Sequence, residues 1–381
     1  MGHCPPAYAK WCGEGVAGLQ EPWAGSGGRF AGAPVCLVLG ASTGGLGRHV
    51  RVLVEALVAA RAQVSVAGPA DTLSRFGYAA AGAGVVQAAG PAGLPRLRSA
   101  VAGAEVVHAH GLTAGLLAGV ATSRAVPFAV TWHNAAFGGR ARRGAQAAAE
   151  HYLARRATVT LCVSPDRVRR AAACGGRPRL IPVGAARLPA PRRSRRQVRA
   201  DLGVGDRALL VCVARLAPQK GLDVLIEAAS LLARHPRRPL VVIAGEGPLQ
   251  ARLASRIADS AAPVRLLGPR SDVADLLAAA DLAVLPSHWE GSPLAAHEAL
   301  QAGCPLVATA VGGVPALTGA DAALLVPPGD PRALARALAG LLDDEEAAQA
   351  LARRGLCRAR EWPDAARSAA RVLDVYAQLL G

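Results

Sequence analysis

The sequence predicts an α/β protein made of two similar units, each a parallel sheet with helices on both faces. Three observations carry the prediction: short apolar runs alternate with helical stretches, the alternation stops in a stretch rich in proline and arginine, and it then restarts. The chain has 381 residues, of which 52% are hydrophobic, so it is long enough and apolar enough to bury two cores.

The first unit begins with an apolar run at 35–39, which predicts a buried strand leading through a glycine-rich turn into a helix at 49–60. The alternation continues with expected strands over 64–67, 105–108, 128–131, 159–163 and 180–183 and expected helices over 112–122, 142–156 and 165–173. We therefore place an N-terminal domain at 34–185. Residues 1–33 are rich in Gly, Ala and Pro without periodicity, which predicts a disordered N-terminal extension.

A basic linker is predicted at 186–200, where proline and arginine replace the apolar pattern. The second unit, at 201–362, contains expected strands over 209–213, 240–244, 264–267, 282–285, 306–308 and 322–326 and expected helices over 222–233, 249–258, 272–279, 294–301 and 331–342. A final helix is expected within 363–381, after the Trp362-Pro363 break. Because ligands of parallel sheets bind at the carboxyl ends of the strands, two such units predict a cleft that holds one ligand from both sides.

The composition excludes several classes of protein. Aromatic residues make up only 3% of the chain, which argues against a nucleic-acid binder that stacks bases. No apolar run reaches the roughly 18 residues of a membrane span, since the longest candidate, 111–123, ends at Arg124. The N-terminus lacks a secretory signal pattern, and the eight cysteines are scattered without a C-x-x-C pair. We therefore expect reduced thiols and a cytoplasmic protein.

The formal net charge is +16, and its excess is local. Residues 140–199 contain sixteen arginines against Glu150 and Asp166. This stretch predicts an anionic partner, and an anionic membrane surface would hold the protein peripherally at its inner face. A solvated, arginine-rich surface without a partner explains the same composition, and both interpretations stay open.

A glycine-rich turn, Gly44-Gly45-Leu46-Gly47, follows the first strand. Glycine lets a backbone approach a phosphate closely, and the next helix start offers N–H groups and the positive end of its dipole. The turn is not a G-x-G-x-x-G motif, and no acidic residue closes the second strand near Ala67 to hold a dinucleotide ribose. Alone, it is equally compatible with a plain tight turn.

Two cations, Arg215 and Lys220, lie just past an expected strand and just before an expected helix. A pair of cations at such a turn suits a diphosphate. Lysine occurs in this chain only here and at Lys10, so its use at position 220 points to a need for a compact ammonium. A chance lysine on a surface loop is the alternative.

Two glutamates, Glu290 and Glu298, are separated by seven residues. The first lies in the turn after the expected strand 282–285 and the second on the helix that starts at Leu294, so both can face the carboxyl end of the sheet. Residues 291–293 open that helix and leave N–H groups available for an anion. A carboxylate accepts hydrogen bonds from two vicinal hydroxyls, as on a sugar. A solvated glutamate on a helix is the plainer interpretation.

Four histidines fall at or near strand ends in the first half. His108 and His110 share one face of a strand by alternation, and His110 is nearer the carboxyl end. His133 follows the next strand, and His49 follows the glycine-rich turn. We favour ligand contacts for His110 and His133. The alternatives are a core histidine at one position of the His108/His110 pair, a backbone hydrogen bond at His133 and a surface position at His49.

In this order and spacing, the three motifs resemble the retaining family-4 glycosyltransferases of the GT-B fold. The resemblance covers about residues 34–381. Its most specific segments are the two glutamates followed by Ala299-Leu300-Gln301-Ala302-Gly303 and by Pro305-Leu306-Val307-Ala308-Thr309, the turns Gly312-Gly313-Val314-Pro315 and Pro327-Pro328-Gly329-Asp330, and Arg215 with Lys220-Gly221. It implies two Rossmann-like domains facing a central cleft, with the last helix crossing back onto the N-terminal domain.

The resemblance also assigns roles. It implies that Arg215 and Lys220 hold the diphosphate of a nucleotide sugar, that Glu290 holds the transferred sugar and that Glu298 holds the ribose. The expected donor-binding residues are Gly44, Gly45, Arg215, Lys220, Arg270, Glu290, Gly291, Ser292, Pro293, Leu294 and Glu298. The expected catalytic residues are His110, Arg215, Lys220 and Glu290, and the expected acceptor-side residues are Gly45, His110 and His133.

The implied reaction moves a sugar from a nucleotide-diphosphate sugar to an acceptor hydroxyl with retention at the anomeric carbon. No metal is expected, because the sequence has no Asp-x-Asp, and the nucleotide sugar is the only co-substrate. UDP and GDP donors stay open, as do small-molecule, lipid-linked and glycan acceptors. The alternatives are a phosphorylase-like enzyme of the same fold or a non-catalytic sugar-nucleotide-binding protein. An NAD-dependent oxidoreductase lacks its fingerprint here, and a nucleic-acid binder lacks a recognisable module.

Overall fold

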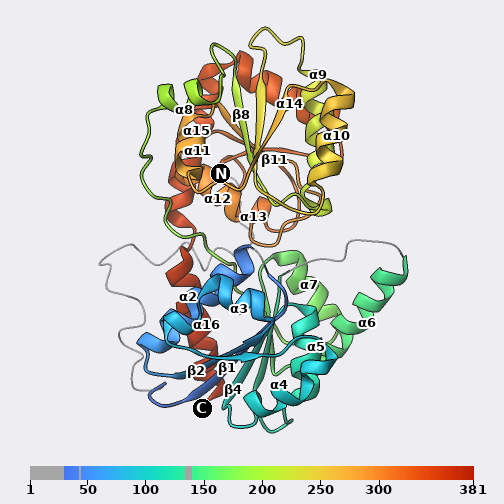
Figure 1. Ribbon diagram of the computed structural model, residues 1–381, viewed down its shortest axis with the longest axis vertical. Coiled ribbons are helices and arrows are strands. Elements are labelled where there is room, and N and C mark those ends of the chain that lie inside the picture. Colours follow the sequence, from blue (N-terminus) through green and yellow to red (C-terminus); the bar gives the residue numbers. More distant parts are fainter. Residues whose placement is uncertain (1–29, 43, 134–139) are drawn as a thin grey trace. The chain divides into compact units, whose positions relative to one another are not determined.

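The computed structural model describes residues 30–42, 44–133 and 140–381. The chain divides into two compact units (Figure 1). The N-terminal unit consists of the described residues up to Gly184 together with Pro363–Gly381, and the C-terminal unit is Ala185–Trp362. The terminal segment therefore belongs to the N-terminal unit, as the family resemblance implies.

The N-terminal unit contains a seven-stranded parallel sheet in the order β3-β2-β1-β4-β5-β6-β7. Its strands are β1 (Pro34–Leu39), β2 (Gln63–Gly68), β3 (Gly84–Gln87), β4 (Val106–His110), β5 (Phe128–Trp132), β6 (Val159–Cys162) and β7 (Pro178–Leu180). Its helices are α2 (Gly45–Ala59), α3 (Ala70–Phe76), α4 (Leu94–Val101), α5 (Leu112–Ala121), α6 (Arg140–Arg156), α7 (Pro165–Ala173) and α16 (Ala365–Leu379), with short 3₁₀ turns at Ala79–Ala81 and Pro91–Gly93.

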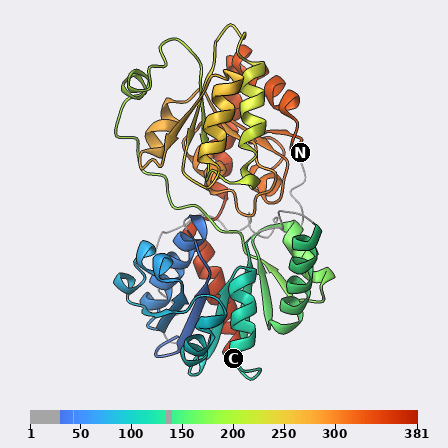
Figure 2. The same ribbon diagram turned by 45° about the vertical axis from the view of Figure 1, so that its right-hand side comes forward.

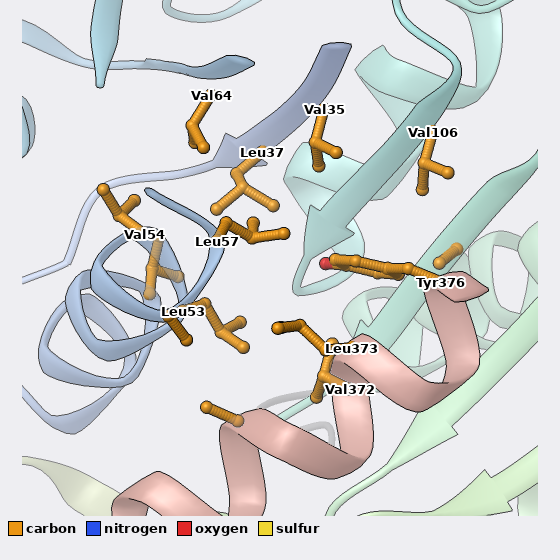
Figure 3. Close-up of a cluster of buried hydrophobic side chains, with 14 of the residues drawn as sticks. Val35, Leu37, Leu53, Val54, Leu57, Val64, Val106, Val372, Leu373 and Tyr376 are labelled. Carbon is orange, nitrogen blue, oxygen red and sulfur yellow. The ribbon is translucent and has the colours of Figure 1, made fainter. Parts of the chain in front are cut away.

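Alternate residues of β1 enter two different cores. Leu37 packs with α2 and the terminal helix α16, whereas Cys36 packs with α4, α5 and α6 on the other face. Helix α16, red in Figure 1, lies beside α2 although more than 300 residues separate them in sequence. Figure 3 shows Leu373 and Tyr376 of α16 directed toward α2 and the sheet. The last helix is therefore part of this core.

The C-terminal unit contains a six-stranded parallel sheet in the order β10-β9-β8-β11-β12-β13. Its strands are β8 (Leu209–Val213), β9 (Leu240–Ala244), β10 (Val264–Gly268), β11 (Leu282–Leu285), β12 (Leu306–Thr309) and β13 (Leu324–Val326). Its helices are α8 (Arg195–Asp201), α9 (Leu222–Leu231), α10 (Gln250–Ser260), α11 (Val273–Ala279), α12 (Leu294–Gln301), α13 (Val314–Thr318), α14 (Pro331–Asp343) and α15 (Glu345–Glu361), with the 3₁₀ turn η3 at Pro218–Lys220. Helices α9, α10 and α14 share one core with the sheet, and Figure 2 shows the two yellow helices, α9 and α10, side by side.

Both sheets reverse their strand order at one point. In the N-terminal unit β1 lies between β2 and β4, and in the C-terminal unit β8 lies between β9 and β11. The loops leaving the two neighbouring strands at such a point turn to opposite faces, so the carboxyl ends of those strands open a crevice for a ligand. The loops expected to bind a ligand are therefore those after β1 and β4 in one unit and those after β8 and β11 in the other.

Two predicted boundaries need correction. The predicted extension 1–33 includes Phe30, which is fully buried in the core with β1, and Gly32, whose N–H donates to the Arg61 carbonyl at 2.9 Å. Residues 30–33 therefore belong to the fold, while the rest of the predicted extension lies outside the described residues. The predicted linker 186–200 ends in helix α8, which Ser194 and Gln197 start with a capping box.

The arginine-rich stretch is divided between the two units. Residues 140–184 contribute ten of its sixteen arginines to the N-terminal unit, and the other six lie in the C-terminal unit. Several of these six are structural: Arg193 pairs with Asp201, Asp272 and Asp275, and Arg195 and Arg199 pair with Asp281. Part of the predicted basic stretch 140–199 is therefore used in ion pairs within the C-terminal unit, and membrane binding by this stretch stays a prediction. Within the described ranges, no helix is both long enough and apolar enough to span a membrane.

Candidate active site

The loops after β8 and β11 bring Lys220 and Glu290 together. The Lys220 ammonium donates to the Glu290 carboxylate with an Nζ–Oε1 distance of 2.6 Å, across 70 positions of sequence. The Ser287 hydroxyl donates to the same oxygen, also at 2.6 Å. Glu290 is only 6% exposed. The sequence predicted both charged residues just past strands. The fold brings them into direct contact beside the adjacent strands β8 and β11, where the strand order reverses.

Glycines make these loops possible, because the backbones approach too closely for a side chain. Gly221 has φ +59°, and a Cβ there would lie 2.1 Å from the Pro286 carbonyl oxygen. Gly312 has φ +52°, and its Cβ would lie 1.8 Å from the Glu290 carbonyl oxygen. The next N–H, of Gly313, donates to that same oxygen at 2.9 Å. The Gly312-Gly313 turn therefore fixes the backbone of Glu290.

Arg215 lies on the same β8 loop as Lys220, and its side chain is exposed. Among the described residues, no carboxylate forms an ion pair with Arg215. Its guanidinium can therefore bind a ligand. The loop is shaped by two glycines that the sequence analysis did not single out. A Cβ at Gly245 would lie 2.0 Å from the Ala214 carbonyl oxygen, and one at Gly247 would lie 2.4 Å from that of Leu216. In the sequence, the Gly-x-Gly pattern at 245–247, just past β9, could have indicated this close approach of two backbones.

Helix α12 presents its N-terminus beside Glu290. No side chain caps it, and its first turn contains only Leu294, Ala295 and Ala296 before the first i−4 bond, from His297 N–H to the Pro293 carbonyl. The Leu294 N–H donates to the Ser292 carbonyl at 3.0 Å, and the other first-turn N–H groups with the positive dipole end suit an anion. Glu298 is half-buried on the same helix, one turn on, and residues 291–293 form the turn between Glu290 and the helix.

Arg270 is engaged within the protein. Its guanidinium binds Asp272 through two hydrogen bonds, Nε–Oδ1 at 2.8 Å and Nη2–Oδ2 at 2.6 Å. Asp272 also pairs with Arg193, so its carboxylate joins the two arginines. The hydrogen bonds from Arg270, with the positive charge of both arginines, hold the pKa of Asp272 below its usual range. A role for Arg270 beside a nucleotide base stays a prediction, one that requires a stacked or backbone contact instead of a free guanidinium.

In the N-terminal unit, the glycine-rich turn leads directly into helix α2. The helix starts at Gly45, and no side chain at Gly44 caps it. The Ser42 hydroxyl accepts from the Gly47 N–H at 3.1 Å. A Cβ at Gly47 would lie 2.0 Å from the Phe76 ring, so this glycine serves helix packing, whereas a Cβ at Gly44 would meet nothing within 4 Å, which leaves room for a ligand at the helix N-terminus. A ligand contact at Gly45 stays a prediction.

Four histidines cluster where β1, β4 and β5 end. The ring centroids of His108 and His110 lie 4.0 Å apart, as expected for one face of β4. The rings of His110 and His133 lie 5.5 Å apart, and His49 of α2 lies within 5.8 Å of both. His49 is 6% exposed, so it is not the surface residue that the sequence also allowed. Within the described ranges, no set of three or more His, Cys, Asp or Glu could hold a metal ion.

Burial keeps these histidines neutral. Loss of hydration lowers the pKa of His49 to about 4 and that of His108 to about 3, the latter with a smaller contribution from His49. Burial likewise lowers the pKa of His110 and of His133 well below the ordinary value, and repulsion between neighbouring rings adds to the effect. At neutral pH, each ring therefore offers one N–H donor and one acceptor nitrogen.

Acid should destabilise the N-terminal unit well above the pH at which carboxylates titrate. Between the unfolded pKa of about 6.5 and the lower folded values, only the unfolded chain binds protons at these rings. The contribution of these neutral histidines to the free energy of unfolding is thus fully present above about pH 6.5, and it is lost as the pH drops toward 4. For His49 alone, the shift to about 4 corresponds to roughly 3 kcal/mol. Urea denaturation measured between pH 7 and about pH 4.5 should show this loss, and His49→Gln should make the pH dependence shallower.

The exposed residue His151 provides the control for that experiment. His151→Gln should keep the wild-type dependence of unfolding free energy on pH. Equal stability of the wild-type protein at both ends of the range would contradict a buried neutral cluster.

The two units match two glycosyltransferase sequence families. Residues 207–344 match the family described as "Glycosyl transferases group 1", and residues 44–186 match the "Glycosyl transferase 4-like domain". The chain belongs to the group 1 glycosyltransferases. Family membership confirms the resemblance drawn from the glutamate, lysine and glycine motifs.

Curated relatives and solved structures agree with this membership. The chain is 36% identical over 207 residues to the D-inositol 3-phosphate glycosyltransferase of Thermobispora bispora, covering 50% of this chain and 47% of that one. It is 37% identical over 210 residues to the enzyme of that name from Kineococcus radiotolerans, covering 49% and 48%. The chain thus spans about half the length of these relatives.

Two solved structures share the fold. Anabaena Alr3699/HepE, in complex with UDP and glucose, superposes with a TM-score of 0.79 at 19% identity, covering 91% of this chain and all of that one. Sucrose-phosphate synthase from Thermosynechococcus elongatus superposes at 0.76 with 23% identity, covering 91% and 99%. These likenesses, with two parallel Rossmann-like sheets, confirm the predicted GT-B fold.

Proposed function

We propose that this member of the group 1 glycosyltransferases transfers a sugar from a nucleotide-diphosphate sugar to an acceptor hydroxyl. The observation that carries the proposal is the contact between Lys220 and Glu290, a cation and a buried carboxylate joined at 2.6 Å where the C-terminal sheet reverses its strand order. One group suits phosphate oxygens and the other suits sugar hydroxyls, so the pair matches the junction between the two parts of an activated sugar.

The diphosphate gains negative charge as its bond to the sugar breaks. Lys220, Arg215 and the uncapped N-terminus of α12 all offer positive charge or N–H groups on neighbouring loops. Groups aimed at charge that develops during the reaction lower the transition state more than the ground state. Glu290 would accept hydrogen bonds from the hydroxyls of the transferred sugar, and Glu298 would accept them from the hydroxyls of the ribose. This arrangement supplies the leaving-group stabilisation from side chains and backbone alone.

We propose that the transfer retains the anomeric configuration, with the acceptor attacking from the side of the departing phosphate, which takes the acceptor proton. Two observations support this route. The stretches 40–48, 110–113 and 132–133, at the exits of β1, β4 and β5, contain no Asp or Glu that could form a covalent sugar intermediate. His110 and His133, which do lie there, have pKa values lowered by burial and are neutral, so they can hydrogen-bond a hydroxyl without bringing charge.

Binding of the nucleotide tests the proposal first. We expect UDP or GDP, or one of their sugars, at a hundred times its Kd to stabilise the folded protein by about 2.7 kcal/mol, which raises Tm by roughly 5 °C. Differential scanning fluorimetry with the two nucleotides, their sugars and NAD as comparison measures this shift. The donor that binds should then give a glycoside, whose anomeric configuration NMR reads directly.

Other outcomes assign the site differently. Binding without transfer or hydrolysis would favour a non-catalytic sugar-nucleotide-binding protein. Phosphate-dependent release of a sugar phosphate would favour a phosphorylase-like enzyme. A Tm shift with NAD alone would contradict the proposal altogether.

A further inference from the structure

We propose that Tyr376, on the terminal helix, is a positioning residue that acts through His108 to hold the His110 ring in one orientation. The inference rests on the proposed function, because His110 is the residue expected to meet the substrate. It adds a part of the chain, the last helix, to the determinants of that site. All the groups involved lie within the N-terminal unit.

The contact between helix and strand is direct. The Tyr376 hydroxyl lies 2.5 Å from Nδ1 of His108, although 268 positions of sequence separate the two residues. Both side chains are fully buried. Figure 3 shows the Tyr376 ring lying flat beneath the sheet with its oxygen directed away from α16. Phenylalanine would suffice for packing alone, whereas a buried tyrosine hydroxyl needs a hydrogen-bond partner, and here that partner is the imidazole beside His110.

His108 is held at both ring nitrogens. Nδ1 meets Tyr376, and Nε2 lies 2.6 Å from the Thr131 hydroxyl on β5. A neutral imidazole has one donor and one acceptor, so protons can be arranged in only two ways: either Tyr376 donates to Nδ1 and Nε2–H donates to Thr131, or both directions reverse. In each arrangement both nitrogens are satisfied, and the ring cannot turn without losing two buried hydrogen bonds.

His110 depends on this fixed ring. Its centroid lies 4.0 Å from that of His108, with an angle of 38° between the ring planes, so a movement of His108 would displace it. Its Nδ1 lies 3.3 Å from Nε2 of His133. Its own Nε2 is buried, and no partner satisfies it among the described residues. A buried polar atom without a partner is costly and rare in proteins, which indicates that a substrate group or water completes it.

The contacts thus run from Thr131 and Tyr376 through His108 to the His110 ring, whose Nε2 is the atom left for a ligand. Fixing the ring orientation decides where that nitrogen points. A loose His108 would let the His110 ring move, and misplacement of a group that contacts substrate slows transfer more than it weakens donor binding.

The test compares Tyr376→Phe with Thr131→Val and with the control Val372→Ala. The first two remove one hydroxyl each and keep the packing shape. Val372 lies on the same face of α16, buried to 1% exposure, and its truncation loosens the helix without removing a contact to His108. We would record 15N spectra of protein labelled at histidine, with His110 assigned from His110→Asn, and measure kcat and the donor KM for each variant.

We expect one sharp set of His110 15N resonances in the wild type, as for a single ring orientation, and shifted or broadened resonances in Tyr376→Phe and Thr131→Val. We expect kcat to fall roughly tenfold in these two variants with the donor KM unchanged. Val372→Ala should lower Tm yet keep the wild-type spectrum and kcat. Wild-type His110 signals in Tyr376→Phe, or equal changes in Val372→Ala, would overturn the inference. If no donor supports transfer by the wild type, the proposed function fails, and the spectra alone still decide whether Tyr376 positions His110.

Discussion

Replacement of Lys220 by Ala is expected to lower kcat for sugar transfer by roughly a thousandfold. Among the residues that the structure describes, the ammonium is the one charged group seen in direct contact with Glu290, at 2.6 Å. Its loss removes positive charge from the place where the leaving diphosphate gains negative charge. It also leaves a carboxylate that is only 6% exposed without its counter-ion. Both effects act against the transition state.

Two further variants separate these effects. Glu290→Gln keeps an oxygen that can accept from Lys220 and Ser287 but removes the negative charge, so it should preserve the fold and still reduce transfer strongly. Arg336→Ala removes an exposed cation from α14 of the same unit and should leave transfer unchanged. Steady-state kinetics with the donor found by thermal shift, together with circular dichroism, measures all three. Full activity of Lys220→Ala with a defined donor would contradict the assignment of this site.

The sequence could predict Lys220 and Glu290 because each lies within a few residues of an apolar run that had to be a strand. In a parallel sheet, all strand exits share one edge, so charged residues just past strands lie along that edge, and here β8 and β11 are adjacent strands. The direct contact through Oε1 of Glu290 could not be predicted, because it depends on η3 and on the close approach of Gly221 to Pro286.

Other features were beyond reach because their causes are not local in sequence. Strand β3 is a short edge strand whose residues are mostly exposed, so it lacks an apolar run, and α3 and α4 beside it were missed with it. Helix α15 was not among the expected helices, although Asp344 caps it by accepting from Ala347 N–H at 2.9 Å. The hydrogen bond between His108 and Tyr376 joins residues 268 positions apart, and no periodicity or motif spacing in the sequence predicts it.

Replacement of Gly312 by Ala should both destabilise the C-terminal unit and impair donor binding. At φ +52° an L-residue is strained by about 1–2 kcal/mol, and a Cβ placed 1.8 Å from the Glu290 carbonyl oxygen forces the backbone apart at a further cost of roughly 1–3 kcal/mol. The carbonyl that must move belongs to the residue whose side chain meets Lys220. We therefore expect the donor KM to rise even under conditions where the variant is fully folded.

Gly340 gives the matched control for that variant. It lies in the middle of α14, a Cβ there would meet nothing within 4 Å, and its backbone is not in the left-handed region. Gly340→Ala should therefore hold or slightly raise stability, because alanine suits a helix interior better than glycine by up to about 1 kcal/mol. Urea denaturation and donor titration of the two variants measure the contrast. If Gly312→Ala matched Gly340→Ala in both, the close approach of the two loops would not be what holds Glu290 toward Lys220, and the geometry on which the proposed function rests would have to be abandoned.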